Sequence, residues 1–345
     1  RDRSPSRGLG DVYKRQSEEI EKTDIFRDVK LADFEEALAD GRIEYIGDAL
    51  IERYYAAVMA QALRPELGKA AGLRLVYTPL NGSGLVPVMT VLKRMGHTDI
   101  TVVPEQEQPN GDFPTCPYPN PEILEAMQLG LNLCEKLGAD LLLATDPDSD
   151  RVGTAVLQNG TPRLISGNEM GVLLLDFVCR MRRANGTMPE RPVAVKTIVT
   201  TPMAEKVAAH YGVELRNVLT GFKFIGEQIG LLEKAGEAGR YIFGFEESYG
   251  YLSGSFVRDK DAVNASLLIC EMFVWYKSQG KTLADALEAL YTQYGFYEAK
   301  LLSFTFEGSA GFAHMTELLD SLRLSPPAEL AGEAVRQVID YDRDE

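Results

Sequence analysis

The sequence is poor in histidine and cysteine, two residues that often carry catalytic or metal-binding chemistry. Its 345 residues include three histidines and four cysteines. All three histidines lie outside the motifs described below, so a histidine-centred triad has little support. The cysteines are widely spaced without a Cys-x-x-Cys pair, which argues against zinc. We expect three of them, in helical patterns, to be small core residues of a protein in a reducing cytoplasm. These residues are His97, His210, His314, Cys116, Cys134, Cys179 and Cys270.

Basic charge and long apolar runs are also scarce. Lysine and arginine number 36 against 51 aspartates and glutamates, which gives a formal net charge of −15. This balance argues against nucleic acid as a partner, because binding to nucleic acid depends on basic surface. No apolar run is long enough to span a bilayer, so we expect no membrane association. A phosphorylated small molecule remains compatible, since a few local cations in a cleft suffice to bind it.

The most informative stretch is residues 145–153, which read TDPDSDRVG. Three carboxylates, Asp146, Asp148 and Asp150, alternate directly after an apolar run that predicts a buried parallel strand. Open α/β sheets bind their ligands at the carboxyl ends of such strands. Oxygen ligands converging there suit a hard divalent cation, and we expect Mg²⁺. Arg151 follows directly and could hold an anionic group beside the metal.

Other interpretations of this loop differ in what they require. An EF-hand needs glycine at its sixth place and glutamate at its twelfth. Counting from Asp146, those places hold Arg151 and Leu157, so an EF-hand is excluded. A phosphatase of the Asp-x-Asp-x-Thr kind would need threonine where Asp150 stands. A solvated acidic turn without a ligand is the remaining alternative.

The loop resembles the metal-binding loop of the α-D-phosphohexomutases, the phosphoglucomutase and phosphomannomutase superfamily. A second segment, residues 244–251 (GFEESYGY), is similar to the sugar-binding loop of that family. The resemblance implies that Glu246 and Ser248 bind neighbouring ring hydroxyls, which suits a carboxylate acceptor and a hydroxyl that donates or accepts. A plain strand-to-helix turn is the alternative.

Two further segments resemble substrate contacts of the family. Residues 220–224 (TGFKF) place Thr220 and Gly221 at a predicted helix N-terminus, where free amides and the helix dipole favour a phosphate, and Lys223 adds charge. Residues 258–261 (RDKD) predict a charged helix start. The resemblance makes Arg258 and Lys260 contacts to the substrate phosphate or to loop carboxylates.

Two other motifs are given structural roles. Residues 78–84 (TPLNGSG) resemble a family loop in which histidine stands at the place of Asn81, so any role of that side chain is in question. Ser83 in this loop has no base nearby in the sequence, and we interpret the loop as structural. Residues 120–122 (NPE) predict a helix start, with Asn120 as the cap and Pro121 at the first position.

An internal repeat sets the predicted fold class. Helix patterns begin at residues 47 and 167, and each is followed by a β-rich run that ends in Thr-Pro, an offset of about 120 residues. With 45% hydrophobic and 25% charged residues, the chain is expected to form two or three globular domains. Alternating strand and helix patterns predict two similar α/β/α units with mostly parallel mixed sheets, plus remnants of flanking domains.

The resemblance divides the chain further. Residues 1–16 lack periodicity and are expected to be an adaptor-derived leader. Residues 17–46 would end the family's first domain, 47–163 would form the second with the metal loop, and 164–305 the third with the sugar loop. Residues 306–345 would be a linker and the start of the fourth. The family's phosphoserine loop (Thr-x-Ser-His-Asn-Pro) and final phosphate-binding loop (Ser-Gly-Thr-Glu-Pro) do not occur in the sequence.

The resemblance implies a cytoplasmic, Mg²⁺-dependent phosphoglucomutase that interconverts glucose 1-phosphate and glucose 6-phosphate. Phosphoryl transfer would pass through a phosphoserine, with glucose 1,6-bisphosphate as intermediate and activator. The partner is then a phosphorylated hexose, and the oligomeric state is not predicted. The alternatives are a phosphomannomutase, a phosphopentomutase-like activity, or a non-catalytic sugar-phosphate-binding fragment.

Overall fold

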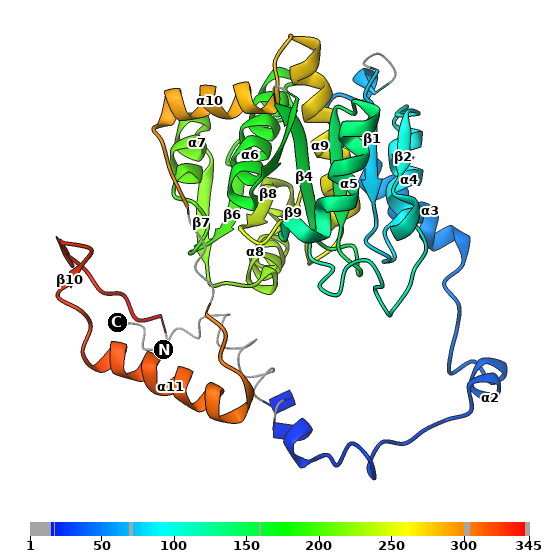
Figure 1. Ribbon diagram of the computed structural model, residues 1–345, viewed down its shortest axis with the longest axis vertical. Coiled ribbons are helices and arrows are strands. Elements are labelled where there is room, and N and C mark those ends of the chain that lie inside the picture. Colours follow the sequence, from blue (N-terminus) through cyan, green and yellow to red (C-terminus); the bar gives the residue numbers. More distant parts are fainter. Residues whose placement is uncertain (1–14, 17, 69–71, 159, 300–303, 342–345) are drawn as a thin grey trace. The chain divides into compact units, whose positions relative to one another are not determined.

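The computed structural model describes residues 15–16, 18–68, 72–158, 160–299 and 304–341 (Figure 1). Most of the predicted leader therefore lies outside the described residues. The chain divides into two compact units, Arg1–Tyr297 and Glu298–Glu345. The larger unit contains both the predicted metal loop and the predicted sugar loop.

The first sheet of the larger unit has the strand order β2-β1-β3-β4-β5. β1 pairs in parallel with β2 and β3, whereas β4 runs antiparallel to β3 and β5 antiparallel to β4. The strands are β1 (Leu75–Thr78), β2 (Ile100–Val102), β3 (Leu141–Thr145), β4 (Val152–Gln158) and β5 (Thr161–Ile165). The helices of this half are α3 (Asp48–Met59), α4 (Leu85–Arg94) and α5 (Leu124–Leu137), with 3₁₀ turns η1 (Pro65–Leu67) and η2 (Pro104–Gln106).

The second sheet repeats this arrangement with the order β7-β6-β8-β9. β6 pairs in parallel with β7 and β8, and β9 runs antiparallel to β8. The strands are β6 (Val193–Thr197), β7 (Glu214–Val218), β8 (Tyr241–Glu246) and β9 (Gly250–Leu252). The helices are α6 (Gly167–Ala184), α7 (Met203–Tyr211), α8 (Phe222–Lys234), α9 (Ala262–Ser278) and α10 (Leu283–Tyr294), with the 3₁₀ turn η3 (Ala238–Arg240). The predicted repeat of two mixed α/β units is confirmed.

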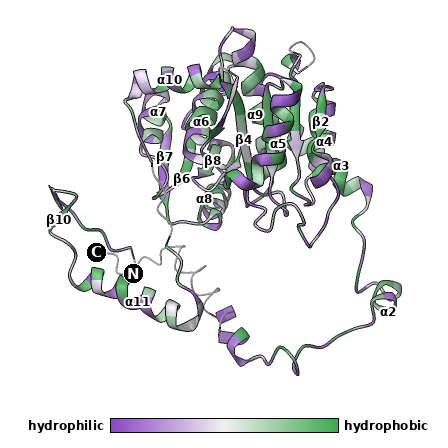
Figure 2. Cartoon of the chain, in the orientation of Figure 1, coloured by the Kyte–Doolittle hydropathy of each residue, from purple (hydrophilic) through white to green (hydrophobic). Residues whose placement is uncertain are grey.

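Helices cover both sheets. α5 packs against β1 and β3, while α8 packs against β6 and β8. The largest buried cluster joins apolar residues of both sheets with α6 and α9, and α9 is buried along most of its length. β3 is buried at every position, as expected for a strand covered on both faces. Figure 2 shows hydrophobic colour along strands such as β4 and mixed colour along helices such as α5. All four cysteines are buried and free.

The helix start predicted at residues 120–122 is wrong. α5 begins at Leu124, and Ile123 is its N-cap residue. The Asn120 side chain instead accepts the backbone N–H of Glu122 at 3.0 Å, which closes a local turn before the helix. The predicted helix ends are confirmed, since Gly138 and Gly212 both adopt left-handed conformations at the ends of α5 and α7.

Short elements lie outside the two sheets. The helix α2 (Phe34–Ala39) precedes α3, and the Asp33 side chain caps it by accepting the N–H of Glu36. In the smaller unit, α11 (Gly308–Leu324) precedes the antiparallel pair β10 (Glu329–Leu330) and β11 (Glu333–Ala334). Among the described residues, no helix has the length and apolar character needed to cross a membrane.

Two helical glycines should respond oppositely to substitution by alanine. A Cβ at Gly171 of α6 would lie 2.1 Å from the buried ring of Phe245, whereas a Cβ at Gly230 of α8 meets nothing within 4 Å. We expect Gly171→Ala to be destabilising, because overpacking costs about 1–3 kcal/mol and exceeds the gain in helix propensity. Gly230→Ala should be stabilising by about 0.5–1 kcal/mol. Urea unfolding of both variants measures this, and an equal response would contradict the packing described for α6.

Candidate active site

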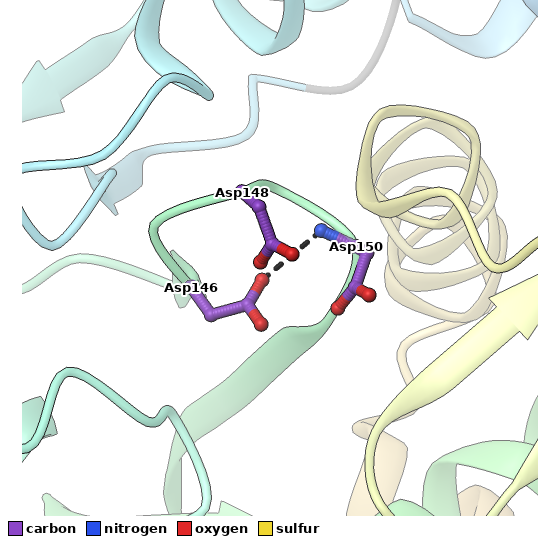
Figure 3. Close-up of side chains that lie close together, drawn as sticks. All are labelled: Asp146, Asp148 and Asp150. Atoms are coloured by element: carbon purple, nitrogen blue, oxygen red, sulfur yellow. Dashed lines mark hydrogen bonds between the residues drawn. The ribbon is translucent and has the colours of Figure 1, made fainter. Parts of the chain in front are cut away.

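The three aspartates of the predicted metal loop lie together between β3 and β4 (Figure 3). One carboxylate oxygen from each of Asp146, Asp148 and Asp150 lies within 4.8 Å of the others. Asp146 is buried, whereas Asp148 is exposed. Oxygen donors alone, with one side open to solvent, form a donor set that suits a hard divalent cation keeping some of its waters. The residues therefore fit such an ion.

Backbone hydrogen bonds to Asp146 shape this loop. Its Oδ1 accepts the N–H groups of Asp150 at 3.0 Å and Arg151 at 2.9 Å. Its carbonyl accepts the N–H of Ser149 at 3.0 Å, and Ser149 has the left-handed φ of 58°. Asp side chains favour turns in this way because they bond to backbone groups a few residues ahead. The position of Asp146 is therefore fixed by the loop itself.

The loop after β1 supports the metal loop from one side. Ser83 donates both its N–H and its hydroxyl to the carbonyl of Pro147, at 2.8 and 3.0 Å. A Cβ at Gly82 would lie 2.3 Å from the Cα of Pro147, so this approach requires glycine. Asn81 is buried and donates to the carbonyl of Gln108 at 2.9 Å. These contacts agree with a structural role for residues 78–84.

Arg151 lies between the metal loop and a glutamate from another segment. Its Nη1 donates to Oε1 of Glu122 at 3.0 Å. Its Nε is 3.9 Å from Oδ2 of Asp146 and 3.8 Å from Oδ1 of Asp150. About a third of the Arg151 side chain is exposed, at 33%. The guanidinium is therefore held near the aspartates and remains accessible.

Burial dominates the electrostatics of Asp146. It raises the pKa of Asp146 to about 7, opposed by the N–H of Arg151 and reinforced by the neighbouring Asp150 and Asp148. Without a cation, like charges this close disfavour simultaneous ionisation. A divalent cation at these oxygens would remove that repulsion.

Lys260 connects the metal loop with the predicted sugar loop. Its Nζ is 3.0 Å from Oδ2 of Asp150 and 3.8 Å from Oε1 of Glu246. Glu246 ends β8 and is buried, which raises its pKa, while Lys260 and a hydrogen bond from Ser248 act in the opposite direction. A Cβ at Gly250 would lie 2.4 Å from Cδ of Lys260, so glycine leaves room for the lysine.

The sugar loop is also fixed by its neighbours. Oε2 of Glu247 accepts the hydroxyls of Thr197 and Thr200, both at 2.9 Å. The N–H of Val152 donates to the carbonyl of Tyr249 at 3.1 Å, so the metal strand and the sugar loop are bonded directly. Glu247, which follows Glu246 at the end of β8, therefore anchors the sugar loop to the end of β6 and the segment after it.

The remaining predicted residues lie around α8. Gly221 is its N-cap residue with φ of 116°, while Thr220 and Lys223 are exposed beside it. The ring of Phe222 is centred 5.9 Å from Nζ of Lys260, which places this helix start near the site. Arg258 is engaged differently, because it pairs with Glu233 of α8 and donates to the carbonyl of Ser255 at 2.7 Å.

Sequence reasoning predicted a helix start at residues 258–261 but identified neither Asp261 as its cap nor Tyr54 as a partner of that cap. Asp261 caps α9 by accepting the N–H groups of Val263 and Asn264, and the hydroxyl of Tyr54 donates to it at 2.9 Å. The acidic residue before the α9 pattern was a detectable signal for the cap. No sequence pattern near Asp261 indicates Tyr54 as its partner, because the two residues are separated by 207 positions.

Two family models match the chain. Residues 52–160 match the model described as phosphoglucomutase/phosphomannomutase, alpha/beta/alpha domain II. Residues 166–294 match the model described as domain III of the same family. Together the two models cover more than half of the chain.

Curated relatives match over longer stretches. A phosphoglucomutase from Staphylococcus saprophyticus is 31% identical over 335 residues, which cover 96% of this chain and 59% of the relative. A phosphoglucomutase from Staphylococcus aureus (strain MRSA252) is 36% identical over 270 residues, which cover 78% of this chain and 48% of the relative. The chain thus spans about half the length of the curated relatives it matches.

Solved structures support the same fold. A putative phosphomannomutase from Thermus thermophilus aligns with a TM-score of 0.57 at 23% identity, covering 74% of this chain and 55% of that one. A phosphoglucomutase/phosphomannomutase family protein from Burkholderia thailandensis aligns with a TM-score of 0.56 at 17% identity, covering 81% and 54%. With both family models matched in order and a relative 31% identical over 96% of the chain, the chain belongs to the α-D-phosphohexomutase superfamily.

Proposed function

We propose that the protein to which this chain belongs is a phosphoglucomutase that interconverts glucose 1-phosphate and glucose 6-phosphate. The observation that carries the proposal is Lys260, which contacts Asp150 of the metal loop and Glu246 of the sugar loop. A cation and a sugar bound at these loops would share one site, as phosphoryl transfer to a sugar requires. The curated relatives named phosphoglucomutase support glucose over mannose or a pentose as the sugar.

Each part of the site has a proposed role. Asp146, Asp148 and Asp150 would hold Mg²⁺, which when bound neutralises charge on the transferred phosphoryl group. Arg151 would donate to an anionic oxygen beside the aspartates. Lys260 would supply positive charge between the metal loop and the sugar loop.

The substrate would be oriented by the second half of the site. Glu246 would accept hydrogen bonds from two sugar hydroxyls, and Ser248 would bond to a neighbouring one. The N-terminus of α8, with Thr220, Gly221 and Lys223, would bind the non-reacting phosphate. Arg258 is paired with Glu233, so any contact it makes to the phosphate would require this pair to open.

The phosphoryl donor and the setting are also proposals. We propose a phosphoserine as donor and glucose 1,6-bisphosphate as intermediate and activator, although the family's serine loop does not occur in this sequence. Free, buried cysteines are typical of a reducing compartment, and we propose the cytoplasm.

The metal assignment is tested by replacing one carboxylate. Asp148→Asn removes a charged ligand from the loop, so Mn²⁺ binding followed by electron paramagnetic resonance should be weakened at least about tenfold. Asp112→Asn, an exposed aspartate in another loop of the same half, is the matched control and should bind as the unmodified chain does. Equal Mn²⁺ binding by the Asp148 and Asp112 variants would contradict the assignment of Asp148 as a metal ligand.

This chain alone should have no mutase activity, because its sequence lacks the serine loop that supplies the phosphoryl group. Glucose 6-phosphate formed from glucose 1-phosphate can be followed through a coupled dehydrogenase, with glucose 1,6-bisphosphate present. Turnover above background would show that the nucleophile lies within these residues. Binding of glucose 1-phosphate without turnover is the expected result.

In the complete enzyme, Glu246→Ala should lower kcat/KM more than Ser248→Ala. Hydrogen bonds to a charged acceptor contribute about 1.5–3 kcal/mol, against roughly 1 kcal/mol for neutral ones. Both kcat and affinity should fall, because sugar orientation also matters in the transition state. Mn²⁺ affinity is the control and should be unchanged. Normal kcat/KM with weakened metal binding in Glu246→Ala would assign this residue to the metal instead.

A further inference from the structure

Glu122 occupies a position that its sequence context does not explain. The segment predicts a helix start, but Glu122 lies before α5 and its side chain turns to Arg151. Oε1 of Glu122 and Nη1 of Arg151 are 3.0 Å apart, and the two side chains are 21% and 33% exposed. A partly buried, charge-assisted hydrogen bond of this kind is stronger than a surface ion pair.

The backbone around Glu122 is built to make this contact. Pro121 is buried against Gly153 of β4, where a Cβ would lie 2.7 Å from both the Cβ and the carbonyl oxygen of Pro121. Glycine at this place therefore lets the segment lie on the strand that begins next to Arg151. The turn closed by Asn120 then directs Glu122, two residues later, to the guanidinium.

Arg151 is also a potential competitor for the metal site. Its Nε lies 3.9 Å from Oδ2 of Asp146 and 3.8 Å from Oδ1 of Asp150, beyond the usual hydrogen-bond distance of about 2.7–3.2 Å. A small shift of the guanidinium would close both contacts. A divalent cation would then have to displace Arg151 from the carboxylate oxygens that would bind the cation.

We propose that Glu122 is a positioning residue that holds Arg151 away from the metal-binding carboxylates. The oxygens that face Arg151, Oδ2 of Asp146 and Oδ1 of Asp150, thereby stay open to a divalent cation, and the guanidinium keeps donors for an anionic oxygen. A guanidinium has five N–H donors, so one bond to Glu122 leaves others unused. The inference rests on the proposed metal site and concerns how that site is kept available.

Mn²⁺ binding by the whole chain, followed by electron paramagnetic resonance, tests the proposal. Glu122→Gln keeps the shape of the side chain but loses its charge, and Mn²⁺ should bind about tenfold more weakly as Arg151 closes on the aspartates. Glu122→Asp keeps the charge on a shorter side chain that does not reach Arg151, so it should weaken binding as well. Thermal unfolding confirms that each variant is folded.

A second background separates positioning from simple charge attraction. In Arg151→Gln, adding Glu122→Gln should have no further effect on Mn²⁺ affinity, because the guanidinium that Glu122 positions is gone. Glu125→Gln, an exposed glutamate in the first turn of α5, is the matched control for loss of charge and should leave binding unchanged.

The outcomes distinguish the two proposals. Equal weakening by Glu122→Gln with and without Arg151, or a normal affinity in Glu122→Asp, would mean that Glu122 acts only through its charge and would overturn the positioning role. A normal affinity in Glu122→Gln, with Asp148→Asn still defective, would also overturn it while leaving the metal site intact. Binding insensitive to Asp148→Asn would instead refute the metal site of the proposed function.

Discussion

Backbone pairing where β4 and β9 begin sets the distance between the two loops of the site. Arg151 and Gly250 form an antiparallel bridge, and the N–H of Val152 donates to the carbonyl of Tyr249. The metal loop joins β3 to β4 and the sugar loop joins β8 to β9, so each follows the third strand of its sheet. Joining the two sheets at this point places equivalent loops face to face. Lys260 is then close enough to contact both.

The repeat extends to the way each loop is supported. The carbonyl of Pro147 accepts two hydrogen bonds from Ser83, which follows β1. The carboxylate of Glu247 accepts two hydrogen bonds from threonines at the end of β6 and just after it, Thr197 and Thr200. In both halves, the segment at the end of the first strand therefore holds the loop after the third. Neighbouring parallel strands end at the same edge of a sheet. The segment after the first strand and the loop after the third are therefore close together in each half.

Local signals in the sequence predicted the strand before the metal loop, the alternating carboxylates and the helix ends at Gly138 and Gly212, because each depends on residues close together. The start of α5 was mispredicted, because the Asn-Pro-Glu pattern is the same whether or not a distant residue uses the glutamate. The Glu122 side chain pairs with Arg151, which is 29 positions away. Tyr54 and Asp261, 207 positions apart, show the same limit. Pairing over such separations depends on how the sheets pack together. The helix and strand propensities of single residues carry no information about that packing.

The charges of the site are compatible with the proposed binding of a phosphorylated sugar by an acidic chain. Arg151 and Lys260 are both surrounded by carboxylates, and each divides its contacts between the metal loop and residues outside it. Arg151 bonds to Glu122 and lies farther from Asp146 and Asp150. Lys260 lies at 3.0 Å from Asp150 and farther, at 3.8 Å, from Glu246. A divalent cation at the aspartates would therefore compete mainly with Lys260, not with Arg151. Released from Asp150, the lysine would retain Asp259, at 3.5 Å, and Glu246, at 3.8 Å, as partners outside the metal loop.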